Sequence, residues 1–348
     1  MSADAPIFIV GAMRSGSTLL RLCLDSHERI AIGPESGFMG AAAAMKAIPG
    51  WDAGPAWYGR FGLSEAEMNA QVAAFFSRIF ERYAAQHGKA RWGDKTPFHT
   101  WHVRQMADIF PQAQFVGIVR HPGATLVSMR GWRYSAADSI SKWVRANSEI
   151  VRQAADLGPE RFAVCRYEDL VLQPETTLRA LLRFLGEPWS DRVLSHDKAQ
   201  RDQGAPTTVE GGTRTRDAID ASRITRWQGE IAAGELALID KRVPHALLGV
   251  LGYDPRSAHP LALPQPLVPV DRADLGRLPQ GKYATGDFDP DRQQLPTDPA
   301  ELAHRLQKAE RALERAGARP AARAARALRR LRRAYRARPP VRARRSAS

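Results

Sequence analysis

PIFIVGAMRSGSTLLRLCLD, residues 6–25, carries the strongest indication of the fold class. The apolar run at 6–12 predicts a buried strand, and a helix-patterned stretch follows at 17–27. The loop between them, GAMRSGST at 11–18, has a glycine at its first and sixth positions and then two hydroxyl residues. Such a loop directs backbone N–H groups and a helix N-terminus toward an anion. The segment therefore predicts a phosphate-binding loop, with a Gly/Ser-rich turn that binds no ligand as the alternative.

Strands and helices alternate along the chain that follows. Ser64 and Glu67 have capping-box spacing at the start of a helix predicted over 65–87. The other predicted strands are 89–93, 114–120 and 162–167, and the other predicted helices are 97–110, 122–132, 139–157 and 174–185. This alternation predicts an α/β fold, a P-loop-like three-layer α/β/α sandwich with a central, mostly parallel β-sheet. Ligands of such sheets bind at the carboxyl ends of the strands.

Composition divides the chain into three regions. We take residues 1–255 as the working domain, in which 36–62 forms an irregular or partly helical insertion rich in Gly, Ala, Pro and Trp. Residues 256–297 are rich in Pro, Asp and Gln and predict an extension or linker. Residues 298–348 predict a charged helix followed by an arginine-rich tail.

The positive charge of the chain is concentrated in that tail. The net charge is +14, but residues 318–348 hold twelve arginines and no acidic residue, which leaves +2 for residues 1–317. The body is therefore nearly neutral, and we expect no specific nucleic-acid partner. The tail is best explained as a solvated extension. Peripheral contact with an anionic membrane surface is the next reading.

Composition also bears on the compartment. With 44% hydrophobic and 25% charged residues, the chain falls among soluble globular proteins. Two cysteines, Cys23 and Cys165, sit in apolar runs where buried free thiols are expected. No stretch approaches the ~20 apolar residues of a membrane-spanning helix. We therefore expect a cytoplasmic protein.

The residue after the second loop glycine separates two kinds of chemistry. A nucleotide kinase has a lysine there, but this chain has Ser17 and carries its cation inside the loop as Arg14. An arginine fork can hold two oxygens of a phosphosulfate at once. No later predicted strand ends in the apolar-run–Asp pattern that would hold Mg²⁺ for phosphoryl transfer. These features favour metal-free sulfuryl transfer, with a P-loop-type ATP-dependent small-molecule kinase as the alternative.

A second anion site is predicted at the next strand end. Arg120 closes the strand at 114–120, and Ser128 follows about two turns into the next helix. An arginine and a hydroxyl so placed form a plausible phosphate clamp. The nucleotides used by kinases have no phosphate to place there, whereas a nucleotide with a 3′-phosphate does. A surface arginine in an ordinary salt bridge is the alternative for Arg120 alone.

At this point the chain resembles the sulfotransferases that use 3′-phosphoadenosine 5′-phosphosulfate (PAPS). It is similar in particular to the branch that includes protein-tyrosine sulfotransferases. The matching segments keep the family's order, which makes the set much more specific than any one member. They are RSGSTLL (14–20), DSHERIAIGPES (25–36), DKTPF (94–98), VRHPGATLVSM (119–129), KWVRAN (142–147), RYEDLVLQPE (166–175), LLRFLGEPW (181–189), RITRW (223–227) and LGYDP (251–255).

The resemblance implies a role for each matched residue. Glu35 would be the catalytic base, Lys95 would stabilise the transferring group, and Tyr167 would pack on or near the adenine. The implied product is adenosine 3′,5′-bisphosphate, and no metal is implied. The residues implied to hold the 5′-phosphosulfate are Arg14, Ser15, Gly16, Ser17 and Thr18, with Arg14 also counted as catalytic, and those implied for the 3′-phosphate are Arg120 and Ser128.

Some assignments stay open at this stage. His27 and His121 lie beside motifs and are alternative bases. The family's second 3′-phosphate arginine has no clean match, because Trp132 occupies its position, and Arg130 or Arg133 could replace it.

The acceptor is the least determined part of the reaction. The family places a serine or threonine before the RITRW-like segment, a position that Thr213 or Thr215 could fill. Loop aromatics could line an acceptor pocket or simply cover the sheet edge. These aromatics are Trp51, Trp57, Tyr58, Phe61, Trp132 and Tyr134. The acceptor hydroxyl could belong to a carbohydrate, a lipid, a small metabolite or a tyrosyl residue.

Overall fold

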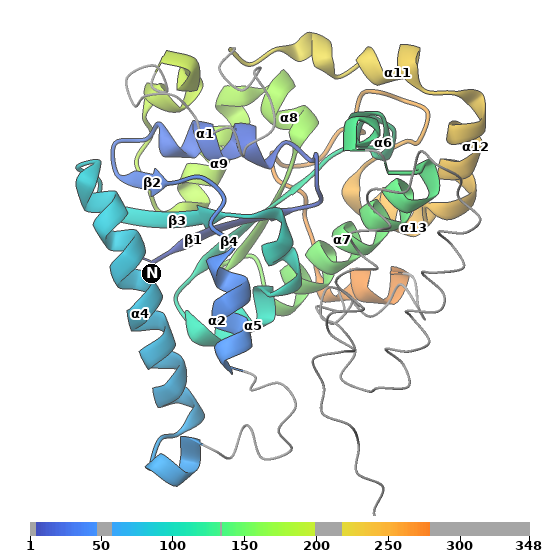
Figure 1. Cartoon of the computed structure of the whole chain (residues 1–348). Helices are drawn as coiled ribbons and strands as arrows, with labels where there is room; N and C mark the ends of the chain where they lie inside the picture. The colour runs from blue at the N-terminus through green and yellow to red at the C-terminus, as the bar shows by residue number, and fades with distance from the viewer. Residues whose placement is uncertain (1–4, 47–57, 133, 199–217, 279–348) are drawn as a thin grey trace, which may run out of the picture. The chain divides into compact units, whose positions relative to one another are not determined.

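A five-stranded parallel sheet forms the centre of the described protein (Figure 1). The computed structural model describes residues 5–46, 58–132, 134–198 and 218–278. The strand order is β2-β3-β1-β4-β5, and every described pair runs parallel. The strands are β1 (Ile7–Gly11), β2 (Ile30–Ile32), β3 (Arg91–Lys95), β4 (Gln114–Val119) and β5 (Phe162–Arg166).

Helices cover both faces of this sheet, which confirms the predicted three-layer α/β/α sandwich (Figure 1). Alternate residues of β1 divide the core, because successive strand side chains point to opposite faces. Phe8 and Val10 join one apolar cluster, and Ile7 and Ile9 join the other. The helices are α1 (Ser17–Asp25), α2 (Phe38–Lys46), α4 (Glu65–Gln86), α5 (Val103–Ile109), α6 (Pro122–Met129), α7 (Ala136–Leu157), α8 (Tyr167–Leu172), α9 (Pro174–Leu185), α11 (Arg226–Glu230), α12 (Ala233–Arg242) and α13 (His245–Leu251).

Local sequence signals account for several helix ends. Ser64 accepts from the Glu67 backbone N–H while the Glu67 carboxylate accepts from the Ser64 N–H, so the predicted capping box begins α4. The helix predicted over 97–110 is instead a 3₁₀ turn at Pro97–Trp101 followed by α5. The insertion predicted over 36–62 contains one α-helix, α2. Outside it, β2 and α8 are elements that the sequence patterns did not indicate.

The order of the strands positions the ligand site. From β1 the chain first builds β2 and β3 on one side and then crosses to β4 and β5 on the other. Open α/β sheets bind ligands outside the carboxyl ends of the strands at such a reversal of direction. The loop after β1 lies at this point.

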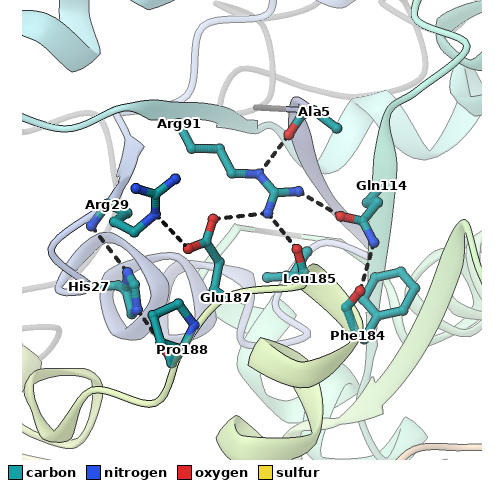
Figure 2. Close-up of polar contacts among 9 residues, drawn as sticks. All are labelled: Ala5, His27, Arg29, Arg91, Gln114, Phe184, Leu185, Glu187 and Pro188. Atoms are coloured by element: carbon teal, nitrogen blue, oxygen red, sulfur yellow. Dashed lines mark hydrogen bonds and ion pairs between the residues drawn. The ribbon is translucent and has the colours of Figure 1, made fainter. Parts of the chain in front are cut away.

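A buried polar network holds the opposite ends of the strands together (Figure 2). The side chain of Arg91, at the start of β3, is fully buried. It donates to the Ala5 carbonyl at 2.6 Å, to Gln114 Oε1 at 2.6 Å and to the Leu185 carbonyl at 2.6 Å. It also pairs with Glu187 Oε1 at 3.1 Å. Because these partners precede or begin β1 and β4 or follow α9, the network joins the amino ends of three strands to a covering helix.

The described residues belong to one compact unit, Met1–Gly286. Residues 256–278 are part of this unit: the Val268 N–H donates to the Val164 carbonyl of β5 at 2.8 Å, and Arg166 donates to the Leu261 carbonyl at 2.8 Å. The first part of the region read as an extension therefore lies on the sheet. The boundary at 255 and the charged segment 298–348 stay predictions, because the rest of that region lies outside the described residues.

Candidate active site

The loop after β1 has the backbone geometry of an anion cradle. Arg14 has φ 67° and Gly16 has φ 96°, so the chain turns through left-handed conformations before α1 begins at Ser17. A β-carbon on Gly16 would lie 2.3 Å from the Tyr167 ring. Glycine is therefore required here both for its φ value and for its lack of a side chain. Successive N–H groups in such a turn, followed by a helix N-terminus, favour a bound anion.

The two predicted anion sites meet in space. Arg14 Nε donates to Ser128 Oγ at 2.9 Å, which links the loop after β1 to the helix α6. Arg120 Nη1 approaches the Arg14 carbonyl oxygen at 3.3 Å. Burial, and then the charge of Arg120, lower the pKa of the Arg14 guanidinium. Two partly buried cations at such close range favour an anion between or beside them.

The Tyr167 ring contacts a residue of each predicted anion site, Gly16 in the first and Arg120 in the second. It is buried at the start of α8, and its ring covers Gly16 while the Arg120 guanidinium lies 4.2 Å from the ring centroid. The side chain thus sets the position of Arg120 by a cation–π contact. Whether the ring also contacts an adenine stays a prediction.

Unsatisfied polar atoms mark the same place. Ser15 Oγ and Arg120 Nε are buried and have no hydrogen-bond partner among the described residues. Buried polar atoms are normally paired, and each one without a partner needs an explanation, of which a bound ligand is one. A nucleotide with a 5′-phosphosulfate and a 3′-phosphate offers acceptor oxygens to both, so the residues present fit that ligand.

Glu35 and Lys95 form a close ion pair beside the loop. Lys95 Nζ donates to Glu35 Oε1 at 2.5 Å and lies 3.3 Å from Thr18 Oγ1, at the start of α1. The Lys95 side chain is fully buried, whereas the Glu35 side chain is 30% exposed. The carboxylate is therefore the member of the pair that a solvent-borne acceptor can approach. This contact brings together two residues that the sequence placed 60 positions apart.

Thr100 secures the start of the loop. Its hydroxyl accepts from the Gly11 N–H at 2.9 Å and donates to the Gly11 carbonyl at 3.2 Å. Sequence reasoning missed this residue, because a threonine in a 3₁₀ turn carries no signal of its long-range partner. The contact supports the carboxyl end of β1, where the loop begins.

The two histidines considered as alternative bases are both engaged. His27 Nε2 lies 2.9 Å from the Pro188 carbonyl, and its Nδ1 accepts from the Arg29 N–H at 3.1 Å. His121 Nδ1 accepts from the Gly123 N–H at 3.1 Å, and its Nε2 lies 2.8 Å from the Asp254 carbonyl. Each ring is buried. Both nitrogens of each ring are already in contact with the backbone, so neither histidine has a nitrogen available to take the acceptor proton. The structure therefore argues against His27 and His121 as the base.

Arg130 is also held elsewhere. It donates to the Glu230 carbonyl at 2.8 Å and forms an ion pair with Glu235 of α12. It would have to leave both contacts to bind a 3′-phosphate. Other open assignments lie outside the described residues, namely Trp51, Trp57, Arg133, Thr213, Thr215, the tail, and the side chains of Tyr58 and Trp132.

Two further observations concern the described ranges alone. Across residues 5–46, 58–132, 134–198 and 218–278, none of the helices combines the length and apolar character needed to cross a bilayer. Within the same ranges, no group of three or more His, Cys, Asp or Glu side chains is placed to hold a metal ion.

Comparison with known proteins identifies the family of this chain. A model of the sulfotransferase family matches residues 6–191, which is more than half of the chain. The matched region runs from β1 to just beyond α9 and includes the predicted donor loop, Glu35, Lys95 and the second anion site. The chain belongs to the sulfotransferase family and is an enzyme of that family.

Individual relatives narrow the comparison. The chain is 31% identical over 295 residues to protein-tyrosine sulfotransferase 1 of Danio rerio, covering 80% of this chain and 81% of the relative. It is 30% identical over 279 residues to protein-tyrosine sulfotransferase 2 of Gallus gallus, covering 75% and 73%. Among solved structures, the sulfotransferase domain of the Synechococcus PCC 7002 olefin synthase superposes with a TM-score of 0.51 at 25% identity, covering 72% of this chain and 96% of that one.

Proposed function

We propose that this enzyme transfers a sulfuryl group from PAPS to a hydroxyl group of an acceptor, releasing adenosine 3′,5′-bisphosphate. The observation that carries the proposal is the hydrogen bond from Arg14 to Ser128, which joins the loop after β1 to the clamp at Arg120. One continuous cationic site of this kind suits a nucleotide with anionic groups at both its 5′ and its 3′ positions. ATP and ADP offer nothing to the second part of that site.

The chemistry requires an acceptor oxygen to attack sulfur as the sulfur–oxygen bond to the 5′-phosphate breaks. The acceptor proton goes to Glu35, whose carboxylate is the exposed member of its pair with Lys95. Negative charge develops on the oxygen that leaves with the 5′-phosphate, and Lys95 is a buried cation within reach of the start of α1. Arg14 and the loop N–H groups hold the phosphosulfate in line with the acceptor.

A small-molecule kinase is the alternative that family membership disfavours. Ser17 stands where a kinase has its phosphate-binding lysine, and it begins α1 directly. Lys95, which lies 3.3 Å from Thr18 Oγ1 at the head of that helix, comes from β3 and not from the loop.

The acceptor class follows less directly than the donor. Two relatives that cover most of the chain are named for sulfation of protein tyrosine, so a peptide tyrosyl hydroxyl is the first acceptor to test. Carbohydrate, lipid and small-metabolite hydroxyls belong in the same panel. A cytoplasmic location is part of this proposal, and it favours acceptors that are present in the cytoplasm over tyrosines of secreted proteins.

The direct test incubates the purified full-length chain with PAPS labelled in its sulfuryl group and the acceptor panel, with and without EDTA. We expect labelled product with at least one acceptor class, and activity that survives EDTA. In parallel, adenosine 3′,5′-bisphosphate should raise the melting temperature more than ADP or Mg·ATP does. Equal or greater stabilisation by Mg·ATP, together with absence of sulfuryl transfer, would favour the kinase instead.

A further inference from the structure

Three consecutive residues around the proposed base contact three consecutive residues at the end of β3. Glu35 pairs with Lys95 at 2.5 Å, and Ser36 Oγ donates to Asp94 Oδ2 at 2.6 Å. The N–H of the next residue, at 37, donates to Thr96 Oγ1 at 3.2 Å. We call these three contacts the base ladder. The last two residues of β3 and Thr96, the residue that follows the strand, supply one side of each contact, so the end of a central strand defines where this loop lies.

Ser36 is fixed from two directions. Besides donating to Asp94, its hydroxyl oxygen accepts from the Phe38 N–H at 3.0 Å, at the first residue of α2. Gly37 between them has φ 68° and is exposed, so the chain makes a tight turn immediately after Ser36. One hydroxyl thus ties the sheet, the turn and the start of a helix together, directly beside Glu35.

Asp94, the partner of Ser36, is a carboxylate buried next to Lys95. It is buried, and burial raises its pKa to about 6, against the opposing effects of Ser36 and Lys95. His99 from the following 3₁₀ turn faces the same carboxylate, with Nδ1 3.5 Å from Asp94 Oδ2. Burial, and then the charges of His102 and Lys95, lower the pKa of His99 to about 3, so this ring is neutral. A buried carboxylate is costly unless hydrogen bonds or opposite charges compensate it, and the Ser36 hydroxyl supplies such a hydrogen bond.

We infer that Asp94 and Ser36 are positioning residues for the proposed base, holding the Glu35 carboxylate at the angle and distance at which it can take the acceptor proton. This inference rests on the proposed function of Glu35. General-base catalysis depends on reach and alignment, and a displacement of about 1 Å can cost roughly 10²-fold in rate. The Ser36–Asp94 contact is the one of the three that joins the short side chain next to Glu35 to the buried end of β3.

The test compares Ser36→Ala and Asp94→Ala with the parental enzyme in single-turnover sulfuryl transfer. We expect the single-turnover rate constant for transfer to fall roughly 10- to 100-fold in each variant. The affinity for adenosine 3′,5′-bisphosphate should be unchanged. The double variant should be little worse than either single variant, because both break the same contact. Asp94→Asn keeps an acceptor for the Ser36 hydroxyl and should recover part of the rate lost in Asp94→Ala. Ser141→Ala, which removes a hydroxyl bonded to the Ala137 carbonyl within α7, is the matched control and should not change the single-turnover rate constant.

The decisive measurement is the rate loss that Ser36→Ala causes in the Glu35→Gln variant, compared with the loss that it causes in the parental enzyme. If Ser36 acts through Glu35, then Ser36→Ala should have almost no further effect once Glu35→Gln is present. A full-sized loss in that background, or a parental rate for Ser36→Ala alone, would overturn the inference and leave the proposed function intact. A parental rate for Glu35→Gln would instead overturn the base assignment, and the ladder's role with it. Ser36 is partly exposed, so its alanine variant provides a test even if Asp94→Ala fails to fold.

Discussion

Arg14 and Ser128 are 114 positions apart in the chain, yet the guanidinium of one donates to the hydroxyl of the other at 2.9 Å. The bond runs from the loop after β1 to the helix after β4, the two strands that pair at the centre of the sheet. It makes one site of two motifs that the sequence presents separately. A ligand that engages both motifs should therefore sense a change at either one.

Ser128→Ala should weaken binding of adenosine 3′,5′-bisphosphate by roughly 10-fold or more, because a hydrogen bond to a charged group contributes about 1.5–3 kcal/mol. Adenosine 5′-phosphate has no 3′-phosphate and should lose much less affinity. Calorimetric titration with both nucleotides measures the difference. An equal loss for the two would mean that Ser128 acts only by orienting Arg14.

Three variants separate binding from catalysis. Glu35→Gln should lower turnover by the ~10²–10⁴-fold typical of a lost general base and leave nucleotide affinity nearly unchanged. Arg14→Ala should reduce both, since Arg14 holds the phosphosulfate before and during transfer. Lys95→Met should have a larger rate defect than binding defect. Titration with adenosine 3′,5′-bisphosphate and single-turnover transfer measure the two quantities, and parental turnover in Glu35→Gln would show that the base lies elsewhere.

Gly16→Ala should abolish nucleotide-induced stabilisation. The new methyl group would lie 2.3 Å from the Tyr167 ring, and alanine disfavours the φ of 96°. Gly234→Ala is the matched control, because nothing lies within 4 Å of its added carbon and it sits inside α12. The control should keep the nucleotide response and gain up to about 1 kcal/mol of stability. Thermal melts with and without adenosine 3′,5′-bisphosphate decide the matter, and a normal response in Gly16→Ala would refute this account of the loop.

Glu187→Ala should destabilise the fold by about 3–5 kcal/mol, because it breaks a buried ion pair by removing the carboxylate 3.1 Å from the Arg91 guanidinium. Glu175→Ala breaks a pair with Arg179 in which both side chains are largely exposed, and should cost less than about 1 kcal/mol. Denaturant unfolding of the two variants gives the comparison. Similar losses in both would mean that the network in Figure 2 contributes little to the free energy of unfolding.

His121 should make stability depend on pH. Burial, the largest cause, lowers its pKa to about 4, whereas an unfolded histidine titrates near 6.5. The unfolded chain therefore binds a proton that the folded protein resists, and this stabilisation is lost as pH falls from about 6.5 to about 4.

The matching variant is His121→Asn, which can still accept from the Gly123 N–H as a helix cap but cannot titrate. The free energy of unfolding of the parental protein minus that of the variant should fall by about 3 kcal/mol as the pH is lowered from about 6.5 to about 4. His99 and Asp94 titrate in both proteins, so their contributions cancel in the difference. A pH-independent difference would show that His121 is charged in the folded state or titrates normally.

Much of the architecture could be predicted from local patterns. The apolar run at 6–12, the loop glycines and the Ser64 cap each specify an element through neighbours a few positions away. The boundaries of β3 could not be placed this way, and the strand runs to Lys95 rather than ending at 93. Charged residues at 94 and 95 resemble a turn in sequence, but they lie buried at the end of the strand, where the Ser36 hydroxyl donates to Asp94 and the Glu35 carboxylate accepts from Lys95.

Local sequence patterns were enough to predict the class of fold, the anion loop with Ser17 at the lysine position and Arg14 inside the loop, and the residues proposed to act on the donor. Only the tertiary structure decided which of these residues touch. The contacts Arg14–Ser128, Lys95–Glu35 and Ser36–Asp94 join segments that are distant in sequence. The physical reason is that parallel strands bring their carboxyl ends to one edge regardless of chain separation. Strand order and burial then fix which side chains meet there and which charges are compensated.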